Sequence, residues 1–151
     1  MKIDAILCNH AETANNLLYL AGGGINVTYA PPSAKPPFQV SLGIGLVVTV
    51  PPDRSDDEYT LELRLLAADD QPVLLPIRDD ELSPLVALLH FRAMRKKDLP
   101  DGDDLTVALA MNFVSLPLPA FGRYEFVFSF EGKEVRRLPL RMQEAPTPQP
   151  D

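Results

Sequence analysis

The chain has 151 residues, of which 46% are hydrophobic and 23% are charged, and these values are typical of one soluble globular domain. Its net charge of −7 disfavours non-specific binding to nucleic acid. The sequence contains no run of about 18 apolar residues and no basic stretch before an apolar one, so we expect neither a membrane span nor a secretory signal. The lone Cys8 cannot form an intramolecular disulfide, which predicts a cytoplasmic location.

The first expected element is a β-hairpin near the N-terminus. Asp4–Cys8 and Leu17–Ala21 flank Asn15 and Asn16, which tolerate the left-handed backbone of tight turns. Gly22–Gly24 follows, but the next residues alternate like a strand rather than opening a helix, so a phosphate-binding loop is disfavoured. We expect these glycines to form a bend between strands.

Strict alternation of apolar and polar residues predicts the central strands. It extends from Phe38 to Val50 and recurs over 59–65, 105–113 and 124–130. The apolar faces of these strands are expected to form one core that includes Leu42, Ile44, Leu61, Leu63, Leu109, Phe126 and Phe128.

Proline marks the remaining boundaries, because 16 prolines are about twice the usual share of roughly 5%. Pro72 and Pro76 reduce Val73–Ile77 to a short edge segment. The stretch 85–95 is open to two interpretations: alternation over 89–93 favours a strand, whereas Ser83 followed by Pro84 is typical of a helix N-terminus.

The C-terminal part is expected to form a hairpin and a tail. Phe130 to Val135 turns through Gly132, and Pro139 makes the last strand an edge strand or a strand end. We therefore expect a β-sandwich domain over 1–143 and a disordered proline-rich tail over 144–151.

The fold class predicted from these elements is all-β: an antiparallel, immunoglobulin-like β-sandwich of about eight strands. Tyr124 follows a corner containing Pro119 and Gly122 and opens a late strand. Immunoglobulin-like sandwiches place at such a corner a tyrosine whose hydroxyl ties the preceding loop to the strand. An ordinary core tyrosine is the alternative.

Short segments at both ends of the chain carry a family resemblance. They are Ala5–Glu12, Leu18–Gly24, Leu118–Tyr124 and Leu138–Leu140. Through them the chain resembles a bacterial family of small, uncharacterised β-sandwich proteins, a domain-of-unknown-function family. The resemblance implies a cytoplasmic β-sandwich and brings no established activity, cofactor or catalytic residue.

Cys8, His10 and Glu12 alternate along one expected strand and would face the same side, which suggests a metal site or a thiol–imidazole pair. Residues two apart on a strand stand roughly 6.5 Å apart, which is too far for a direct Cys–His hydrogen bond. A buried thiol and a histidine at a strand end are the favoured interpretation. An enzyme using Cys8 and His10 remains an alternative.

Acidic residues gather in four expected loops, 53–58, 69–70, 79–81 and 98–104. If successive loops alternate ends, 53–58 meets 79–81 and 69–70 meets 98–104, which would suit calcium binding. Ordinary turn residues that keep the domain soluble are the favoured interpretation.

No catalytic set converges in the sequence, so we expect a non-enzymatic binding or assembly module with no catalytic, cofactor-binding or metal residues and no cofactor. The basic group at 92–97 is followed at once by aspartates, and this mixed charge is typical of a solvated face. The expected partner is a protein rather than nucleic acid, and edge strands leave homo-oligomerisation open.

Overall fold

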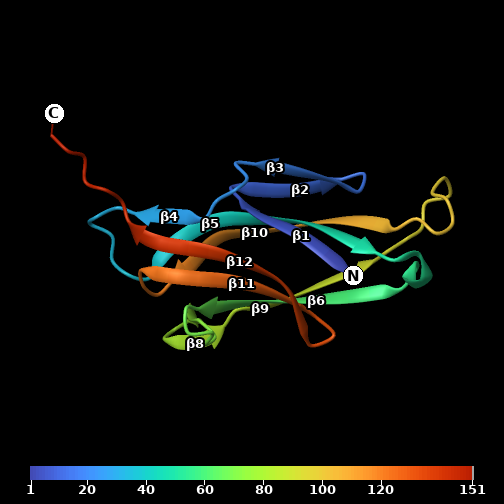
Figure 1. Cartoon of the computed structure of the whole chain (residues 1–151). Helices are drawn as coiled ribbons and strands as arrows, with labels where there is room; N and C mark the ends of the chain where they lie inside the picture. Colours follow the sequence, from blue (N-terminus) through green and yellow to red (C-terminus); the bar gives the residue numbers. More distant parts are fainter. Residues whose placement is uncertain (151) are drawn as a thin grey trace.

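The computed structural model describes residues 1–150, the side chain of Ile77 excepted, and it is built from β-strands and one short 3-10 turn, Pro52–Arg54 (Figure 1). One sheet has the order β1 (Lys2–Cys8), β5 (Phe38–Val50) and β10 (Leu105–Leu118). A second has the order β4 (Val27–Ala30), β12 (Lys133–Glu144), β11 (Gly122–Phe130), β6 (Glu58–Ala67) and β9 (Val86–Arg92). Two hairpins complete the fold, β2 (His10–Ala14) with β3 (Leu17–Ala21) and β7 (Leu74–Arg78) with β8 (Glu81–Pro84).

The two larger sheets share one hydrophobic core, as the alternation predicts. All seven alternate apolar residues of β5 are at most 5% exposed, and Phe126 and Phe128 of β11 are fully buried. Across the core, Phe113 of β10 stacks on Phe126 with ring centroids 5.9 Å apart. Leu109 packs against this core but is only half-buried, because β10 is an edge strand.

The expected fold class is confirmed in its all-β composition and not in its immunoglobulin-like, purely antiparallel topology. The five-stranded sheet is mixed, because β4 pairs with the end of β12 in parallel. The chain reaches this position after Gly24, whose N–H donates to the carbonyl of Leu7, and Asn26, whose carbonyl accepts from Arg141. The bend expected at Gly22–Gly24 is confirmed, with Gly22 and Gly24 at positive φ.

The N-terminal hairpin has the predicted turn but a different first strand. Asn15 and Asn16 both have positive φ, 52° and 57°, and they join β2 to β3. Asp4–Cys8, expected in this hairpin, belongs instead to β1 and pairs with β5. The prediction fails here because the chain bends at Asn9, which separates β1 from β2.

The β2–β3 hairpin lies on the outer face of the three-stranded sheet as an additional layer (Figure 1). Glycine permits this close approach: a Cβ at Gly45 would come within 2.5 Å of the Leu20 side chain, and one at Gly43 within 2.6 Å of Asn112. The side-chain amide of Asn112 accepts a hydrogen bond from the N–H of Ala11 and donates one to the carbonyl of the same residue. These contacts fix the hairpin on the sheet.

The open interpretation of 85–95 resolves in favour of a strand. β9 pairs with β6 in a continuous antiparallel register from Glu58↔Arg92 to Arg64↔Val86. Ser83 and Pro84, which suggested a helix N-terminus, belong to β8. The expected edge segment Val73–Ile77 corresponds to β7, which pairs with β8 around a turn at Asp79 and Asp80.

The C-terminal hairpin is confirmed, with β11 and β12 joined by Glu131 and Gly132 at positive φ. Pro139 lies where β12 has no neighbour on its β4 side, because β4 pairs only with 141–144. The sheet extends one residue beyond the boundary expected at 143: β12 ends at Glu144, and the N–H of Ala145 donates to Ala30. Residues 146–150 form neither helix nor strand, and Asp151 lies outside the described residues.

Candidate functional site

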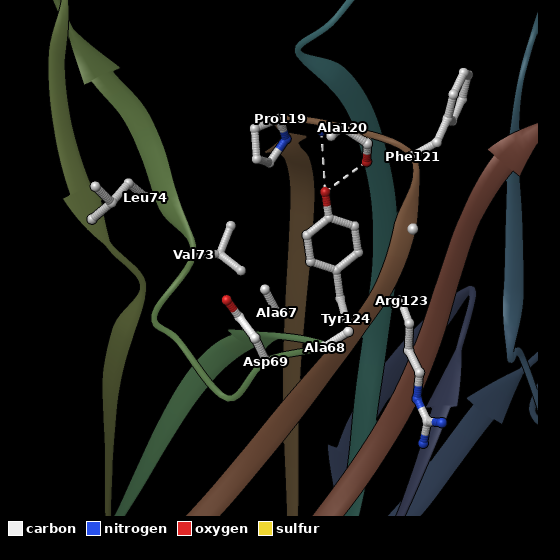
Figure 2. Close-up of a pocket in the computed structure, with 11 residues that line it drawn as sticks. Ala67, Ala68, Asp69, Val73, Leu74, Pro119, Ala120, Phe121, Arg123 and Tyr124 are labelled. Carbon is white, nitrogen blue, oxygen red and sulfur yellow. Dashed lines mark hydrogen bonds between the residues drawn. The ribbon is translucent and has the colours of Figure 1, made fainter.

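A hollow of about 500 Å³ opens where the end of β6 and the start of β7 meet the corner between β10 and β11 (Figure 2). We call it the Tyr124 hollow; its lining residues are Ala67, Ala68, Asp69, Val73, Leu74, Pro119, Ala120, Phe121, Gly122, Arg123 and Tyr124. Most of these side chains are small and apolar, so the hollow can hold an apolar group.

The corner that carries Tyr124 has the hydrogen bonds expected from the sequence. The Tyr124 hydroxyl donates to the carbonyl of Ala120 at 2.6 Å and accepts from the N–H of the same residue at 3.1 Å. Gly122, at φ +141°, gives the corner a backbone that a side chain would strain. Burial raises the pKa of Tyr124, opposed by the Ala120 bond, so the hydroxyl stays neutral and engaged. It serves the fold and is not free for a ligand.

The remaining polar groups around the hollow are also engaged. Asp69 accepts a hydrogen bond from the N–H of Gln71, which closes its turn. Arg123 Nη2 contacts Glu125 Oε1 at 2.9 Å. Two large apolar side chains are exposed here, Leu74 at 49% and Phe121 at 46%, although Phe121 points away from Tyr124 and stacks on Phe38 at 4.4 Å (Figure 2). The hollow therefore offers apolar surface and no free acid–base pair.

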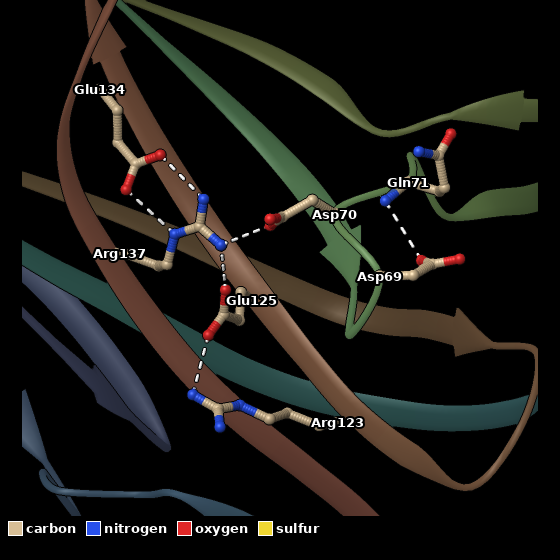
Figure 3. A network of polar contacts seen from close by, with 7 residues as sticks. All are labelled: Asp69, Asp70, Gln71, Arg123, Glu125, Glu134 and Arg137. Carbon is tan, nitrogen blue, oxygen red and sulfur yellow. Dashed lines mark hydrogen bonds and ion pairs between the residues drawn. The ribbon is translucent and has the colours of Figure 1, made fainter.

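Arg123 connects the hollow to an ion network on the outer face of the five-stranded sheet (Figure 3). At its centre, Arg137 makes a bidentate contact with Glu134, at 3.0 and 2.8 Å, and contacts Asp70 at 2.6 Å. It also contacts Glu125, which lies between the two arginines. These hydrogen bonds raise the pKa of Arg137 above its usual range, and the bond from Arg137 lowers the pKa of Glu134.

The network has a structural effect that bears on the hollow. Asp70 stands in the turn 68–71, which leads from β6 to the Val73 wall, and its bond to Arg137 ties this turn to β12. Each charged side chain in the network contacts an opposite charge within it, so it carries no free catalytic group. It positions one wall of the hollow against the sheet.

The structure separates Cys8 from His10 and Glu12. Cys8 is fully buried at the end of β1, whereas His10 and Glu12 are exposed on β2. Their expected placement on one face is wrong, because the bend at Asn9 shifts the alternation and turns Ala11 inward instead. On β2, His10 Nε2 lies 3.9 Å from Glu12 Oε2. Burial raises the pKa of the Cys8 thiol, which disfavours the thiolate that catalysis or metal binding needs.

The acidic loops are distributed differently from the sequence expectation. β9 returns directly along β6, so 93–104 lies at the 53–58 end, where the N–H of Asp56 donates to the carbonyl of Ala93. The connection 68–85, including the β7–β8 turn, lies at the other end (Figure 1). Within the described residues, no three metal-ligating side chains come together.

The basic group after β9 lines a second hollow, of about 480 Å³, beside the edge of β10. Arg92 donates to the carbonyl of Asp56, and Arg95 donates to those of Pro100 and Asp103. Within residues 1–150, neither these arginines nor Lys96 and Lys97 form an ion pair. This segment is therefore a cluster of unpaired positive charge.

Sequence reasoning found the Tyr124 corner but missed the other wall of the hollow. Ala67, Val73 and Leu74 come from a turn and a short strand that no periodicity links to residue 124. The signal that could have found them is Pro72 directly after the Asp69–Asp70 turn, which predicts that the chain reverses at the end of β6.

A family model covers residues 3–143 of the chain, which is almost the whole fold described above. The chain belongs to a family of unknown function, DUF6941. This confirms the resemblance to an uncharacterised small domain. No significant match is found among curated proteins or among solved structures. In the described part of the chain, no helix has the length and hydropathy required to cross a membrane.

Proposed function

We propose that this DUF6941 protein is a non-enzymatic binding module that holds an apolar side chain of a protein partner in the Tyr124 hollow. The observation that carries the proposal is an apolar hollow whose polar side chains, Asp69, Arg123 and Tyr124, each make a contact within the fold. A small-molecule site usually keeps a few convergent polar groups free to orient its ligand. A protein side chain needs none, because its own backbone is positioned by the surrounding interface.

The surroundings of the hollow support a protein partner. Leu74 is about half exposed at its rim, and Phe121, which points outward from the adjoining corner, is about half exposed beside it. Exposed aromatic side chains such as Phe121 are common anchors of protein interfaces. Arg123, half-exposed at the same rim, supplies the polar border. The hydrogen bonds of Tyr124 and the Asp70–Arg137 contact keep both walls in place before binding, which lowers the entropic cost of association.

A non-enzymatic role is supported by the positions of Cys8 and His10. The thiol is buried and its pKa is raised, while the imidazole is exposed on another strand. We also propose a cytoplasmic location, since a reduced lone thiol suits a reducing compartment. Fractionation of source cells tests the location, and recovery of the protein outside the cytoplasm would contradict it.

The test compares Leu74→Asp with Leu82→Asp on the immobilised full chain in extracts of the source cells. Both leucines lie on the β7–β8 hairpin with similar exposure, 49% and 57%, but only Leu74 lines the hollow. We expect a partner that the wild type and Leu82→Asp capture to be lost with Leu74→Asp. Equal capture by both variants, with their folds intact by circular dichroism, would refute the role of the hollow.

A further inference from the structure

The five-stranded sheet ends at β9, and the outer edge of this strand has no partner among the described residues. β9 is seven residues long, contains neither proline nor lysine, and keeps a continuous register with β6. Natural proteins usually protect an edge strand with a proline, a lysine or a bulge, because unpaired N–H and carbonyl groups attract another strand. β9 has none of these protections.

Two other edges in the fold, those of β12 and β10, are protected. Pro139 interrupts the exposed edge of β12. The edge of β10 is closed near its start by the side-chain amide of Asn16, which donates to the carbonyl of Thr106 and accepts from the N–H of Ala108. A register shift after Phe113 disrupts β10 further along. These two edges are blocked by different devices, and β9 has neither of them.

The core is also incompletely covered on the side of β9. The inward residues of the interior strands β5 and β6 are buried, but Ala87, Leu89 and Phe91 of β9 are only half-buried. On the outer face of the same strand, Val86 and Leu88 are 48% and 55% exposed. Another strand beside β9 would cover apolar side chains on both faces at once.

We propose that the occupant of this edge is β9 of a second copy of the chain, paired antiparallel about a two-fold axis. An isologous interface requires a self-complementary surface, and antiparallel pairing sets inward residues beside inward ones and outward beside outward. With the axis at Leu89, Leu88 lies opposite His90 and Val86 opposite Arg92, so no like charges oppose each other directly. The two five-stranded sheets join into one continuous sheet.

Charge at the two ends of β9 favours a second copy over an unrelated strand. The β7–β8 turn carries Asp79 and Asp80, and Glu81 opens β8. The segment 92–97, from the end of β9 onward, carries four cations with no ion pair within residues 1–150, although the carboxylates of 53–58 and 98–104 lie at the same end. Antiparallel pairing places the cations of 92–97 of one copy beside the end of β9 that leads to the acidic turn of the other. By symmetry, this arrangement offers carboxylates of the second copy to these four cations at both ends of the paired strands.

Sedimentation equilibrium on the full chain tests the proposal, which does not rest on the Tyr124 hollow. We expect the wild type to dimerise with increasing concentration, and Leu88→Lys to raise the dimer dissociation constant at least about tenfold by placing a charge on the exposed edge. Leu17→Lys is the matched control, because Leu17 is 58% exposed on β3 of the other face and should leave the dimer unchanged.

A charge exchange identifies the pairing itself. Lys96→Glu with Lys97→Glu should weaken the dimer, and adding Asp79→Lys with Asp80→Lys should restore it. Hydrogen exchange should show the outward amides of β9 protected only at concentrations where the dimer forms. A wild type that stays monomeric at high concentration, or a dimer that Leu88→Lys leaves intact, would overturn the proposal, as would β9 amides whose exchange is independent of concentration.

Discussion

Removing one oxygen atom, by Tyr124→Phe, should cost about 1–2 kcal/mol in the free energy of unfolding. The hydroxyl makes two hydrogen bonds to Ala120, and each typically contributes a net 0.5–1.5 kcal/mol. The value should stay well below that of Tyr124→Ala, which removes a ring that is only 4% exposed and should cost about 3–5 kcal/mol. At 151 residues, 1 kcal/mol corresponds to a shift in Tm of about 2–4 °C.

Tyr59→Phe provides the matched control. The Tyr59 hydroxyl also ties a loop to a strand, but it makes a single bond, to the carbonyl of Arg54 at 2.7 Å. Urea unfolding of both variants should therefore give a loss at Tyr124 about twice that at Tyr59. Equal losses, or a loss below about 0.5 kcal/mol at Tyr124, would refute the argument that the two bonds hold the corner.

The same corner predicts a dependence on alkaline pH. Burial raises the pKa of Tyr124 in the folded state above the value of about 10 for an unfolded tyrosine. The unfolded chain then ionises more readily, so this stability is complete below about pH 10 and is lost as pH rises through the folded pKa. Tyr124→Phe should flatten the fall of Tm between about pH 9 and 11, and a profile identical to the wild type would contradict the assignment.

Three further outcomes are expected. Gly45→Val should lower stability by about 1–3 kcal/mol and release the β2–β3 hairpin to proteases, because its side chain would collide with Leu20. Limited proteolysis checks this, and Gly102→Val is the control: at φ +97° it strains the backbone, but its Cβ meets nothing within 4 Å, so it should leave the hairpin protected. Cys8 should alkylate slowly in the native protein and rapidly in denaturant, and fast native alkylation at neutral pH would revive the thiol enzyme. Deleting 146–151 should leave Tm unchanged within error in a thermal melt. Deleting 144–151 should lower Tm, because it also removes the hydrogen bond from the Ala145 N–H to the Ala30 carbonyl. Equal effects of the two deletions would contradict a domain boundary after Ala145.

The sequence predicts those features correctly that depend on residues close together in the chain. Alternation over Phe38–Val50 is a local property of one strand, and it predicts the buried face correctly. The Tyr124 corner is also local, because its hydrogen bonds span four residues. Both could be predicted because the interacting residues are neighbours in the chain.

The prediction of strand pairing is wrong where the pairing depends on residues far apart in the sequence. Nothing within 4–8 indicates that β1 pairs with β5 rather than with the next strand, since the deciding contacts are with residues about forty positions away. The positions of the loops also differ from the prediction, because Val73–Ile77, expected as one edge segment, belongs to a hairpin with β8. That extra strand returns β9 to the 53–58 end.

One unused signal was present in the sequence. Gly43 and Gly45 stand on the polar face of β5, where a solvated strand would carry side chains with higher β propensity. Two alternate glycines on one face indicate a close approach from outside the sheet, and the β2–β3 hairpin makes that approach. Recognising this would have predicted a third layer over the sheet.

The β2–β3 hairpin also determines which sheet edges stay open to another strand. By placing Asn16 against Thr106 and Ala108, it closes the β10 edge with side-chain hydrogen bonds that imitate a strand. The open side of the core is then bounded by one closed edge and one free edge, and only β9 can add a strand there. An additional strand would cover the half-buried Leu89 and Phe91 while keeping the solvent-facing charges of the sheet in place. Pairing on β9 is therefore the way in which this domain can complete its core by assembly, independently of what the Tyr124 hollow binds.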